Sequence, residues 1–362
     1  MGCVASSAVD DGSAVSLKSF RTERVLGEGT FGKVSLAVDR RDGRKYALKT
    51  LDKERLRQKN AVKSAIRERF ILISLSSADC SRFVTSLAYT FSDACAVYFV
   101  MDCALGGTLL YHLHHSFPGG FEEGHVRFYA AQLVCGLAHL HAQLILYRDL
   151  KPENTLLTSA GTIMLSDFGV SETLPSASAQ TRGKAGTRAY MPPEALSGGW
   201  YTLTFDWYSL GVTLYQLLHD ALPGEDGLAE AASEEEEERP RRASLSGMRS
   251  SAPWATASPA GRAFVTSLRH SDADARLGAG GASEVRAHPF LAGVDWSAMQ
   301  AGAVPAPFLP ARSTANFELH ADDVLNTLDG GLTPGARKCQ PPAADDADFA
   351  ECVPWARPAS AA

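Results

Sequence analysis

The sequence lacks the features of a secreted, membrane-spanning or zinc-dependent protein. No run approaches roughly eighteen consecutive apolar residues, and the N-terminus has no apolar core of a secretory signal peptide, so we expect neither a membrane span nor export. The seven cysteines contain no Cys-x-x-Cys pair, which disfavours a zinc site and a disulfide framework and indicates reduced, intracellular thiols. Internal repeats are also absent.

A basic excess is missing as well. The formal net charge is -6, so we do not expect nucleic acid as a partner. With 362 residues, 45% hydrophobic and 21% charged, the chain has globular composition and the length for one large or two ordinary domains. The longest run of like charge, Glu234 to Glu238, lies in a region of shifted composition at about 223–260, which we expect to be a flexible, solvated insert.

One short loop, Tyr147 to Asn154, holds an acid, a base and an amide in a fixed order. Asp149 can accept a proton from a substrate hydroxyl, and Lys151 can neutralise charge on a phosphoryl group during transfer. The amide oxygen of Asn154 is a suitable ligand for Mg²⁺. An eight-residue surface loop of this composition can arise by chance, so the interpretation depends on partners elsewhere in the chain.

A glycine-rich segment near the N-terminus reads as a strand, a turn and a second strand, and Ala47-Leu48-Lys49 follows on a third. Glycines let backbone N–H groups approach triphosphate oxygens, while Leu26 and Val34 would cover the adenine. A Rossmann fold is disfavoured because the glycines lead into another strand instead of opening a helix. The nucleotide-binding candidates in this segment are Leu26, Gly27, Glu28, Gly29, Thr30, Phe31, Gly32, Lys33 and Val34.

Together these segments resemble the protein kinase family. The loop at Asp149 resembles the kinase pattern H-R-D-L-x-x-x-N, with Tyr147 in the His position as is usual in the AGC group, and Asp167 begins an Asp-Phe-Gly motif. The resemblance extends from Phe20 to about Pro310. It implies an α+β, bilobal kinase fold with a small β-rich N-lobe, a larger helical C-lobe and an AGC-type C-terminal tail, and it implies ATP and Mg²⁺ as cofactors.

The resemblance also implies roles for particular residues. Asp149 and Lys151 would be catalytic, and Asn154 and Asp167 would bind magnesium. Lys49 would bind the α and β phosphates and pair with Glu68 on a helix at 54–73. Further implied positions are nucleotide contacts at Ala47, Met101, Cys103 and Leu156, substrate contact at Thr187, a buried pair of Glu194 with Arg276, and Asp206 bracing the catalytic loop.

Some positions depart from the AGC pattern. Thr108 stands where AGC kinases generally carry an acidic residue, which argues against strong selectivity for basic substrates. Gly183 stands where many carry a phosphorylated threonine, so activation by phosphate at that position is excluded, although Thr181 lies nearby. Lys151 and Thr187 resemble serine/threonine kinases more than tyrosine kinases.

The expected domain limits follow from these landmarks. We predict a kinase domain at 20–291, with an N-lobe at about 20–102 and a C-lobe at about 103–291, and with helices at 123–146 and 261–270. Residues 292–362 resemble the AGC C-terminal extension. In this tail Trp296 and Phe308 are expected to dock, whereas Phe349-Ala350-Glu351-Cys352 falls short of the F-x-x-F motif.

The first residues, Met1 to Ser7, fit the pattern M-G-x-x-x-[ST] for N-myristoylation of Gly2, and Cys3 offers a site for palmitoylation. We expect residues 1–19 to be a lipidation signal and linker that attaches the protein to the cytoplasmic face of a membrane. An ordinary disordered tail is the alternative.

The sequence therefore predicts a serine/threonine kinase that transfers the γ-phosphate of Mg-ATP to a protein hydroxyl and is monomeric. Arg127 to Ala131 and Arg276 to Gly278 resemble the G-protein-coupled-receptor kinases, whereas Phe317-Glu318-Leu319 resembles the YANK kinases. The alternative function is a pseudokinase scaffold that binds partners without turnover.

Overall fold

The computed structural model describes residues 15–76, 80–223, 257–311, 347–349, 352 and 354–358. Predictions about Gly2, Cys3, Phe317-Glu318-Leu319 and positions 224–256 of the insert expected at about 223–260 lie outside these residues. The chain divides into two compact units, the first comprising 1–80, 85–103 and 317–362, and the second 81–84 and 104–316. A β-rich unit and a helical unit were expected from the sequence, and both are present.

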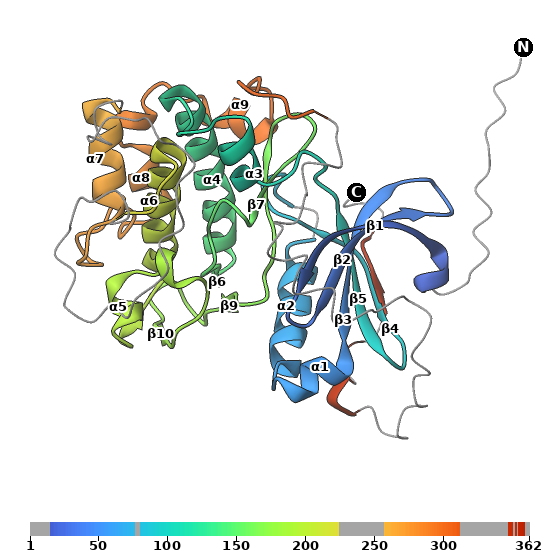
Figure 1. Cartoon of the computed structure of the whole chain (residues 1–362). Helices are drawn as coiled ribbons and strands as arrows, with labels where there is room; N and C mark the ends of the chain where they lie inside the picture. Colours follow the sequence, from blue (N-terminus) through green and yellow to red (C-terminus); the bar gives the residue numbers. More distant parts are fainter. Residues whose placement is uncertain are drawn as a thin grey trace, which may run out of the picture. The chain divides into compact units, whose positions relative to one another are not determined.

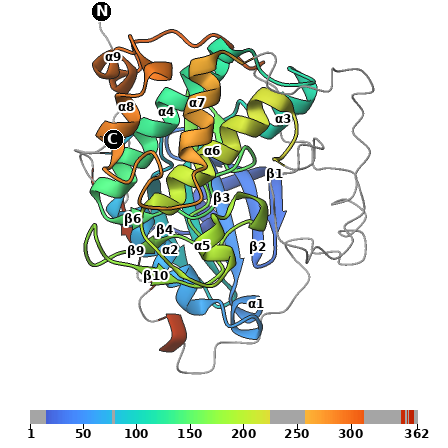
Figure 2. The ribbon, with the colours of Figure 1, turned by 90° about the vertical axis from the view of Figure 1, so that its left-hand side faces the viewer.

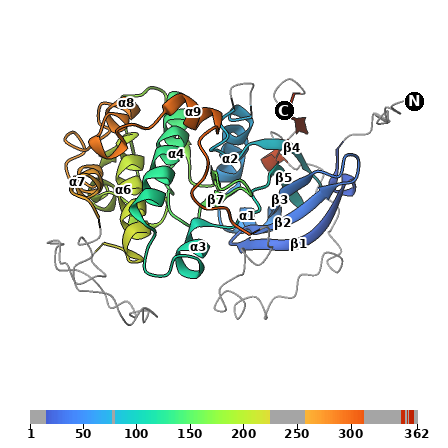
Figure 3. The ribbon, with the colours of Figure 1, turned by 90° about the horizontal axis from the view of Figure 1, so that it is seen from above.

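Unit 1 is built on one six-stranded antiparallel sheet in the order β1-β2-β3-β5-β4-β12. Figure 3 shows the first five strands side by side in this order. The sixth comes from the far end of the sequence. The strands are β1 (Phe20–Gly29), β2 (Gly32–Asp39), β3 (Lys45–Asp52), β4 (Leu87–Ser92), β5 (Ala96–Asp102) and β12 (Trp355–Ala356).

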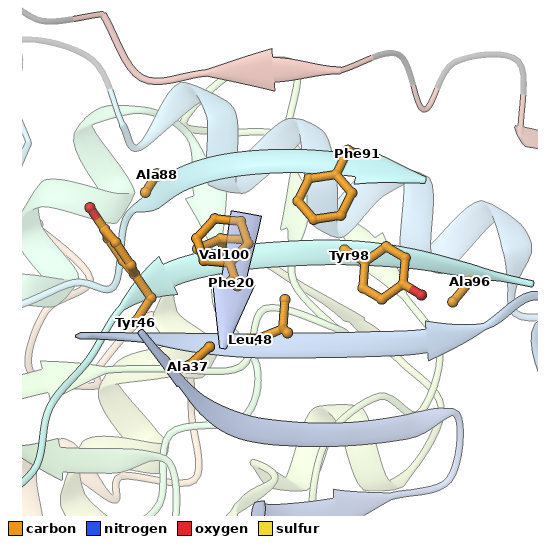
Figure 4. Close-up of a cluster of buried hydrophobic side chains, with 9 residues drawn as sticks. All are labelled: Phe20, Ala37, Tyr46, Leu48, Ala88, Phe91, Ala96, Tyr98 and Val100. Carbon is orange, nitrogen blue, oxygen red and sulfur yellow. The ribbon is translucent and has the colours of Figure 1, made fainter. Parts of the chain in front are cut away.

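Side chains alternate between the two faces of this sheet. Tyr46 and Leu48 on β3 and Val100 on β5 belong to a buried apolar cluster on one face (Figure 4). Burial of each large apolar side chain in such a cluster contributes about 1.5–3 kcal/mol. Ala47 and Lys49 alternate with these residues along β3, so they face the opposite side of the sheet.

Two helices of unit 1, α1 (Lys53–Gln58) and α2 (Val62–Ser74), lie beside the sheet (Figure 1). Asp52 caps α1 by accepting a hydrogen bond from the amide of Arg55 at 2.9 Å. The sequence predicted one helix at 54–73. The two helices are separate because Asn60 has a φ of 53°, a left-handed conformation that ends α1 before α2 begins.

Unit 2 is mainly helical. Helix α4 packs against α6 and α8, and α6 packs against α7 (Figure 2). The predicted helix at 123–146 ends earlier, at Ala142, because Leu144 adopts a positive φ of 59° before a short strand starts. The helices are α3 (Leu109–His115), α4 (Glu123–Ala142), α5 (Pro193–Leu196), α6 (Thr204–His219), α7 (Pro259–Leu268), α8 (Ala282–Arg286) and α9 (Trp296–Ala301).

Three short antiparallel strand pairs, β6–β9, β7–β8 and β10–β11, frame the loops of unit 2. The loop with Asp149 lies between β6 and β7, and Asp167 follows β8 after one residue. The strands are β6 (Ile145–Leu146), β7 (Thr155–Leu157), β8 (Ile163–Leu165), β9 (Glu172–Thr173), β10 (Thr181–Arg182) and β11 (Trp200–Tyr201). The short 3-10 helices are η1 (Leu17–Ser19), η2 (Arg188–Tyr190), η4 (Pro289–Leu291) and η6 (Ala347–Phe349).

Trp296 and Phe308 were expected to dock in a tail that wraps back over the small lobe, whereas both make their contacts within unit 2. The Phe308 ring lies 5.0 Å from the rings of both His112 and Phe117, centroid to centroid. The guanidinium of Arg286 lies 5.2 Å from the Trp296 ring centroid, a cation–π contact. This part of the tail is therefore packed onto the helical unit.

One expectation about the cysteines is wrong. Cys95 is disulfide-bonded, whereas Cys80, Cys103 and Cys135 are free thiols. Among the residues that the structure covers, no helix combines the length and apolar character that crossing a membrane requires.

Candidate active site

Asp206 holds the backbone of the loop that contains Asp149. This aspartate is fully buried on α6 and accepts hydrogen bonds from the amides of Tyr147 at 2.9 Å and Arg148 at 2.8 Å. The imidazole of His141 lies 2.8 Å from its Oδ2. Arg148 has a φ of 68°, a left-handed conformation that costs free energy unless neighbouring contacts hold it. These bonds are the ones that the predicted bracing role of Asp206 requires.

The Asp149 carboxylate is the centre of a compact polar network. Asn154 donates from Nδ2 to Asp149 Oδ2 at 2.7 Å, and Thr187 donates from Oγ1 to Asp149 Oδ1 at 2.7 Å. Lys151 Nζ donates to Thr187 Oγ1 at 2.6 Å and lies 3.0 Å from Asp149 Oδ2. The structure thus brings together four predicted site residues, although Thr187 is far from the others in sequence.

Gly186 allows Thr187 to reach this network. Its φ is 94°, and a Cβ built on it would lie 2.1 Å from the carbonyl oxygen of Arg148. Any side chain here would push the two loops apart. The glycine is therefore required by a close backbone approach next to Asp149.

Asp167 lies at a second turn in the same unit and also has a positive φ, of 57°. Its Oδ1 accepts a hydrogen bond from the Gly169 amide at 3.3 Å. The preceding residue, Ser166, donates from its amide to the carbonyl oxygen of Asn154 at 3.0 Å. The chain segments carrying the two predicted magnesium ligands are thus hydrogen-bonded to each other.

The oxygen atoms of Asn154 and Asp167 are suitable ligands for Mg²⁺. Asn154 donates from Nδ2 to the carbonyl oxygen and to Oδ2 of Asp149. These hydrogen bonds leave the side-chain oxygen of Asn154 as an acceptor. One carboxylate and one amide oxygen suit a cation that keeps water and phosphate oxygens in its shell. The described residues contain no group of three or more His, Cys, Asp or Glu that would form an all-protein cage.

Tyr147, in the loop that contains Asp149, contacts the turn that contains Asp167. Its hydroxyl donates to the carbonyl oxygen of Ser166, and its ring lies 5.3 Å from that of Phe168, centroid to centroid. Burial raises the pKa of Tyr147 well above its usual value, and the nearby carboxylates Asp149 and Asp167 add to the effect. Tyr147 therefore stays a neutral hydrogen-bond donor.

In unit 1 the predicted ion pair is present. Lys49 Nζ lies 2.6 Å from Glu68 Oε1, and the Glu68 carboxylate is almost fully buried on α2. Strand register places other candidates beside Lys49, because Val34 pairs with Lys49 and Ala47 pairs with Met101. All four lie on the sheet face opposite the apolar cluster.

The glycine-rich turn joins β1 to β2, with Gly29 opposite Gly32. A Cβ on Gly32 would lie 1.8 Å from the carbonyl oxygen of Thr50, so Gly32 is needed for packing against β3. Gly27 has nothing within 4 Å of its Cβ position, so packing does not require a glycine there. Cys103, at the end of this unit, is half-buried, and this burial raises the pKa of its thiol to about 12.

Glu194 and Arg276 form the predicted pair in unit 2. Two nitrogens of the fully buried Arg276 guanidinium donate to the two oxygens of Glu194 at 2.8 and 2.9 Å. Such bidentate pairs are among the stronger hydrogen-bonded contacts in proteins. The pair ties the segment after Thr187 to the loop before α8.

Sequence reasoning missed two contacts. Arg148 donates from Nη1 to Glu172 Oε2 at 2.7 Å, and the only sequence signal was an acidic residue shortly after Asp-Phe-Gly. In the tail, Phe349 and Cys352 are each only 5% exposed, although the sequence reading gave this stretch no docking role. Its sole signal was one aromatic residue in a polar context.

Comparison with known proteins places the site in a family context. The model of the protein kinase domain matches residues 20–291. The chain is 36% identical to G protein-coupled receptor kinase 1 of Caenorhabditis briggsae over 89% of the chain and 51% of that protein. It is 36% identical to rhodopsin kinase of Homo sapiens over 80% of the chain and 51% of that protein, and 37% identical to G protein-coupled receptor kinase 4 of Rattus norvegicus over 82% of the chain and 50% of that protein.

The chain thus spans about half the length of the curated relatives it matches. The matches confirm the predicted kinase fold class and the predicted resemblance to the receptor-kinase branch of the AGC group.

Proposed function

Because the chain belongs to the protein kinase family, we propose that it transfers the γ-phosphate of Mg-ATP to a serine or threonine hydroxyl of a protein. The observation that carries this proposal is the network in which Asn154, Thr187 and Lys151 each lie within 3.0 Å of the Asp149 carboxylate. Each of these side chains has the chemistry that its step requires.

Asp149 is the proposed catalytic base. Both of its oxygens are already oriented, one by Asn154 and one by Thr187, so the carboxylate needs little reorganisation to accept the substrate proton. Lys151 supplies a positive charge beside the Asp149 carboxylate. In the proposed reaction this charge neutralises negative charge on the phosphoryl group during transfer.

Asp167 and Asn154 would hold Mg²⁺, which supplies charge neutralisation on the phosphate oxygens when bound. In unit 1, Lys49 would bind the α and β phosphates, and Glu68 orients its ammonium group through the 2.6 Å ion pair. The backbone of the turn from Gly27 to Gly32 would contact the phosphates, and side chains including Leu26, Val34, Ala47 and Met101 would contact the base. Cys103 and Leu156 complete this proposed set.

The proposed substrates are receptors, because the relatives are named as kinases of G protein-coupled receptors and as rhodopsin kinase. A location on the cytoplasmic face of a membrane suits such substrates. We attribute that location to lipids on Gly2 and Cys3, which lie outside the described residues. We further propose that the protein acts as a monomer and does not bind nucleic acid.

The test is transfer of labelled phosphate from ATP to a generic protein substrate by the purified full chain. Asp149→Asn should lower kcat by at least about 100-fold, because it removes the proton acceptor. Asp167→Asn should abolish the Mg²⁺-dependent reaction and leave the fold intact, because it removes the charge of a metal ligand and no apolar core group.

The alternative is a pseudokinase scaffold, which would bind nucleotide or partners without turnover. Wild-type protein that transfers no more phosphate than Asp149→Asn would favour that alternative. Undiminished turnover in Asp167→Asn would contradict the metal assignment.

A further inference from the structure

The end of the chain adds a strand to the nucleotide-binding unit. In β12, Trp355 pairs with Thr90 and Ala356 with Tyr89, so β12 covers the outer edge of β4. Figure 4 shows this strand, in pale red, running along the far side of β4 from β5. Backbone groups at a sheet edge otherwise have only water as a partner. The strand is far too short to hold itself in place by its own ladder.

Two other contacts anchor the same segment to unit 1. The Phe349 ring is buried, with Lys53 Nζ 4.9 Å and the Arg57 guanidinium carbon 5.2 Å from its centroid. Arg57 also pairs with Asp348 at 3.1 Å. The exposed Arg57 pair contributes little, so the aromatic contact is the main anchor at this end.

Arg357 makes the most specific contact of the segment. Its Nε donates to the carbonyl oxygen of Leu87 at 3.0 Å, and its Nη2 donates to Ser86 Oγ at 2.7 Å and to Asp102 Oδ2 at 2.8 Å. Its backbone amide donates to the carbonyl oxygen of Ala88 at 2.8 Å. The side chain is only 14% exposed, so this planar fork is held in one geometry and partly desolvated.

The far end of this contact is the last residue of β5. Asp102 donates from its amide to the Ser86 carbonyl oxygen at 3.0 Å, and Ser86 Oγ donates to Asp102 Oδ2 at 2.5 Å. Asp102 lies between Met101 and Cys103, two of the proposed nucleotide contacts. The Arg357 guanidinium therefore links β4 to the end of β5. This end of β5 includes residues that are proposed to contact the base.

We infer that Arg357 is a positioning residue for nucleotide binding, which acts through Asp102 by fixing the end of β5. The inference rests on the proposed function for the identity of the ligand, Mg-ATP. The contact lies in unit 1, whereas Asp149 and Asp167 belong to unit 2. Loss of Arg357 should therefore weaken nucleotide binding in the ground state and leave the chemical step almost unchanged.

The experiment compares full-length wild type, Arg357→Ala, Arg357→Lys and Asp102→Asn. It measures KM for ATP and kcat with a protein substrate, and Kd for Mg-ATP by calorimetry. For Arg357→Ala we expect KM and Kd to rise on the order of five-fold, with kcat within about two-fold of wild type. The KM and Kd of Arg357→Lys should lie between those of wild type and Arg357→Ala, because lysine keeps the positive charge and loses the planar set of donors.

Adding Asp102→Asn to Arg357→Ala should weaken binding little further, since the two side chains act through one contact. Arg21→Ala is the matched control. Arg21 is an exposed arginine of the same unit that pairs with Glu23, and its loss should change neither constant.

Unchanged Kd and KM in Arg357→Ala would overturn the inference. The role of β12 would then be limited to pairing with the outer edge of β4. If Arg357→Ala does not fold, Arg357→Lys and Asp102→Asn provide the same test, and wild-type affinity in both would overturn it. If wild type transfers no phosphate but binds Mg-ATP, and Arg357→Ala weakens that binding, the proposed catalysis fails while the positioning role stands.

Discussion

Arg148, the residue before the proposed base Asp149, forms a partly buried ion pair with Glu172. Arg148 Nη1 lies 2.7 Å from Glu172 Oε2, and Arg148 Nε donates to the carbonyl oxygen of Val170 at 2.7 Å. The Arg148 side chain is 6% exposed. The positive charge next to Asp149 is thus balanced by a carboxylate of the same chain. A phosphate group is not needed for that purpose.

We predict that the kinase is active without phosphate on the segment between Asp167 and Thr187. Gly183 has no hydroxyl to carry one, and Glu172 supplies the charge. Glu172→Gln should lower kcat on the order of ten-fold, because it leaves the guanidinium of Arg148 buried without a counter-charge. Phosphatase-treated wild type should keep its activity. Steady-state kinetics of both samples provide the check.

Thr181→Val is the control for this prediction. Thr181 Oγ1 lies 3.2 Å from both oxygens of Glu172, so it supports the carboxylate without contacting Arg148. Its replacement should change kcat little. A protein that is inert after phosphatase treatment and regains activity only on modification of Thr181 would contradict the prediction.

Gly186→Ala should inactivate the enzyme. The added methyl group would meet the Arg148 carbonyl oxygen at 2.1 Å and displace Thr187 from Asp149. Gly183→Ala is the matched control. Gly183 also has a positive φ, of 113°, but nothing lies within 4 Å of its Cβ position. Both variants carry backbone strain of about 1–3 kcal/mol, so a much larger loss of kcat in Gly186→Ala isolates the steric effect. Equal losses in the two would refute it.

Arg276→Leu should destabilise unit 2 strongly. Glu194 would lose its bidentate partner at a site where Arg276 is fully buried, which typically costs about 3–5 kcal/mol. Urea unfolding measures the change in the free energy of unfolding. Arg21→Leu breaks an exposed pair and should cost about 1 kcal/mol or less. A loss of similar size in both variants would show that the buried pair has no special structural role.

Acid should destabilise the protein partly through His219. Burial lowers the pKa of His219 from 6.5 to about 4, so in this interval the unfolded chain binds the proton and the folded chain does not. Stability is therefore lost as pH falls from about 6.5 towards 4. His219→Gln should show a smaller drop in Tm between pH 7 and pH 5 than wild type, while the exposed His270→Gln should match wild type. Identical acid profiles for all three proteins would exclude the effect.

Gly2→Ala should release the protein from membranes, because myristoylation requires an N-terminal glycine amine. One myristoyl chain gives only weak binding, on the order of 10⁴ M⁻¹, so Cys3→Ser, which removes the second lipid site, should give an intermediate membrane fraction. Ser7→Ala, which leaves Gly2, Cys3 and Ser6 unchanged, is the control. Cell fractionation provides the measurement. Equal solubility of wild type and the two lipidation-site variants would make this segment an ordinary tail.

Much of the candidate site could be proposed from the sequence because kinase chemistry depends on short local patterns. The loop at Asp149, the turn at Asp167 and the glycine-rich strands are each contiguous, so residue types and spacing were sufficient to propose them. The pairs of Lys49 with Glu68 and of Glu194 with Arg276 were predicted from the family resemblance, and the observed distances agree.

Backbone conformation at single positions was less predictable. The sequence between 54 and 73 has helical periodicity throughout, yet Asn60 adopts a left-handed conformation and divides it into α1 and α2. Periodicity reports which face of a segment is apolar. It does not report the backbone conformation of one exposed residue such as Asn60.

The sequence by itself determined which chemical groups the protein has and the order in which they occur, because these are properties of neighbouring residues. Only the tertiary structure decided which distant groups meet: Glu172 with Arg148, Gly186 with the Arg148 carbonyl, and Arg357 with Asp102. Arg357 and Asp102 are 255 residues apart in the chain, and neither residue type marks the other as its partner. Such pairs depend on how strands and loops pack, since a charge that the packing buries is costly unless a partner of opposite charge lies beside it.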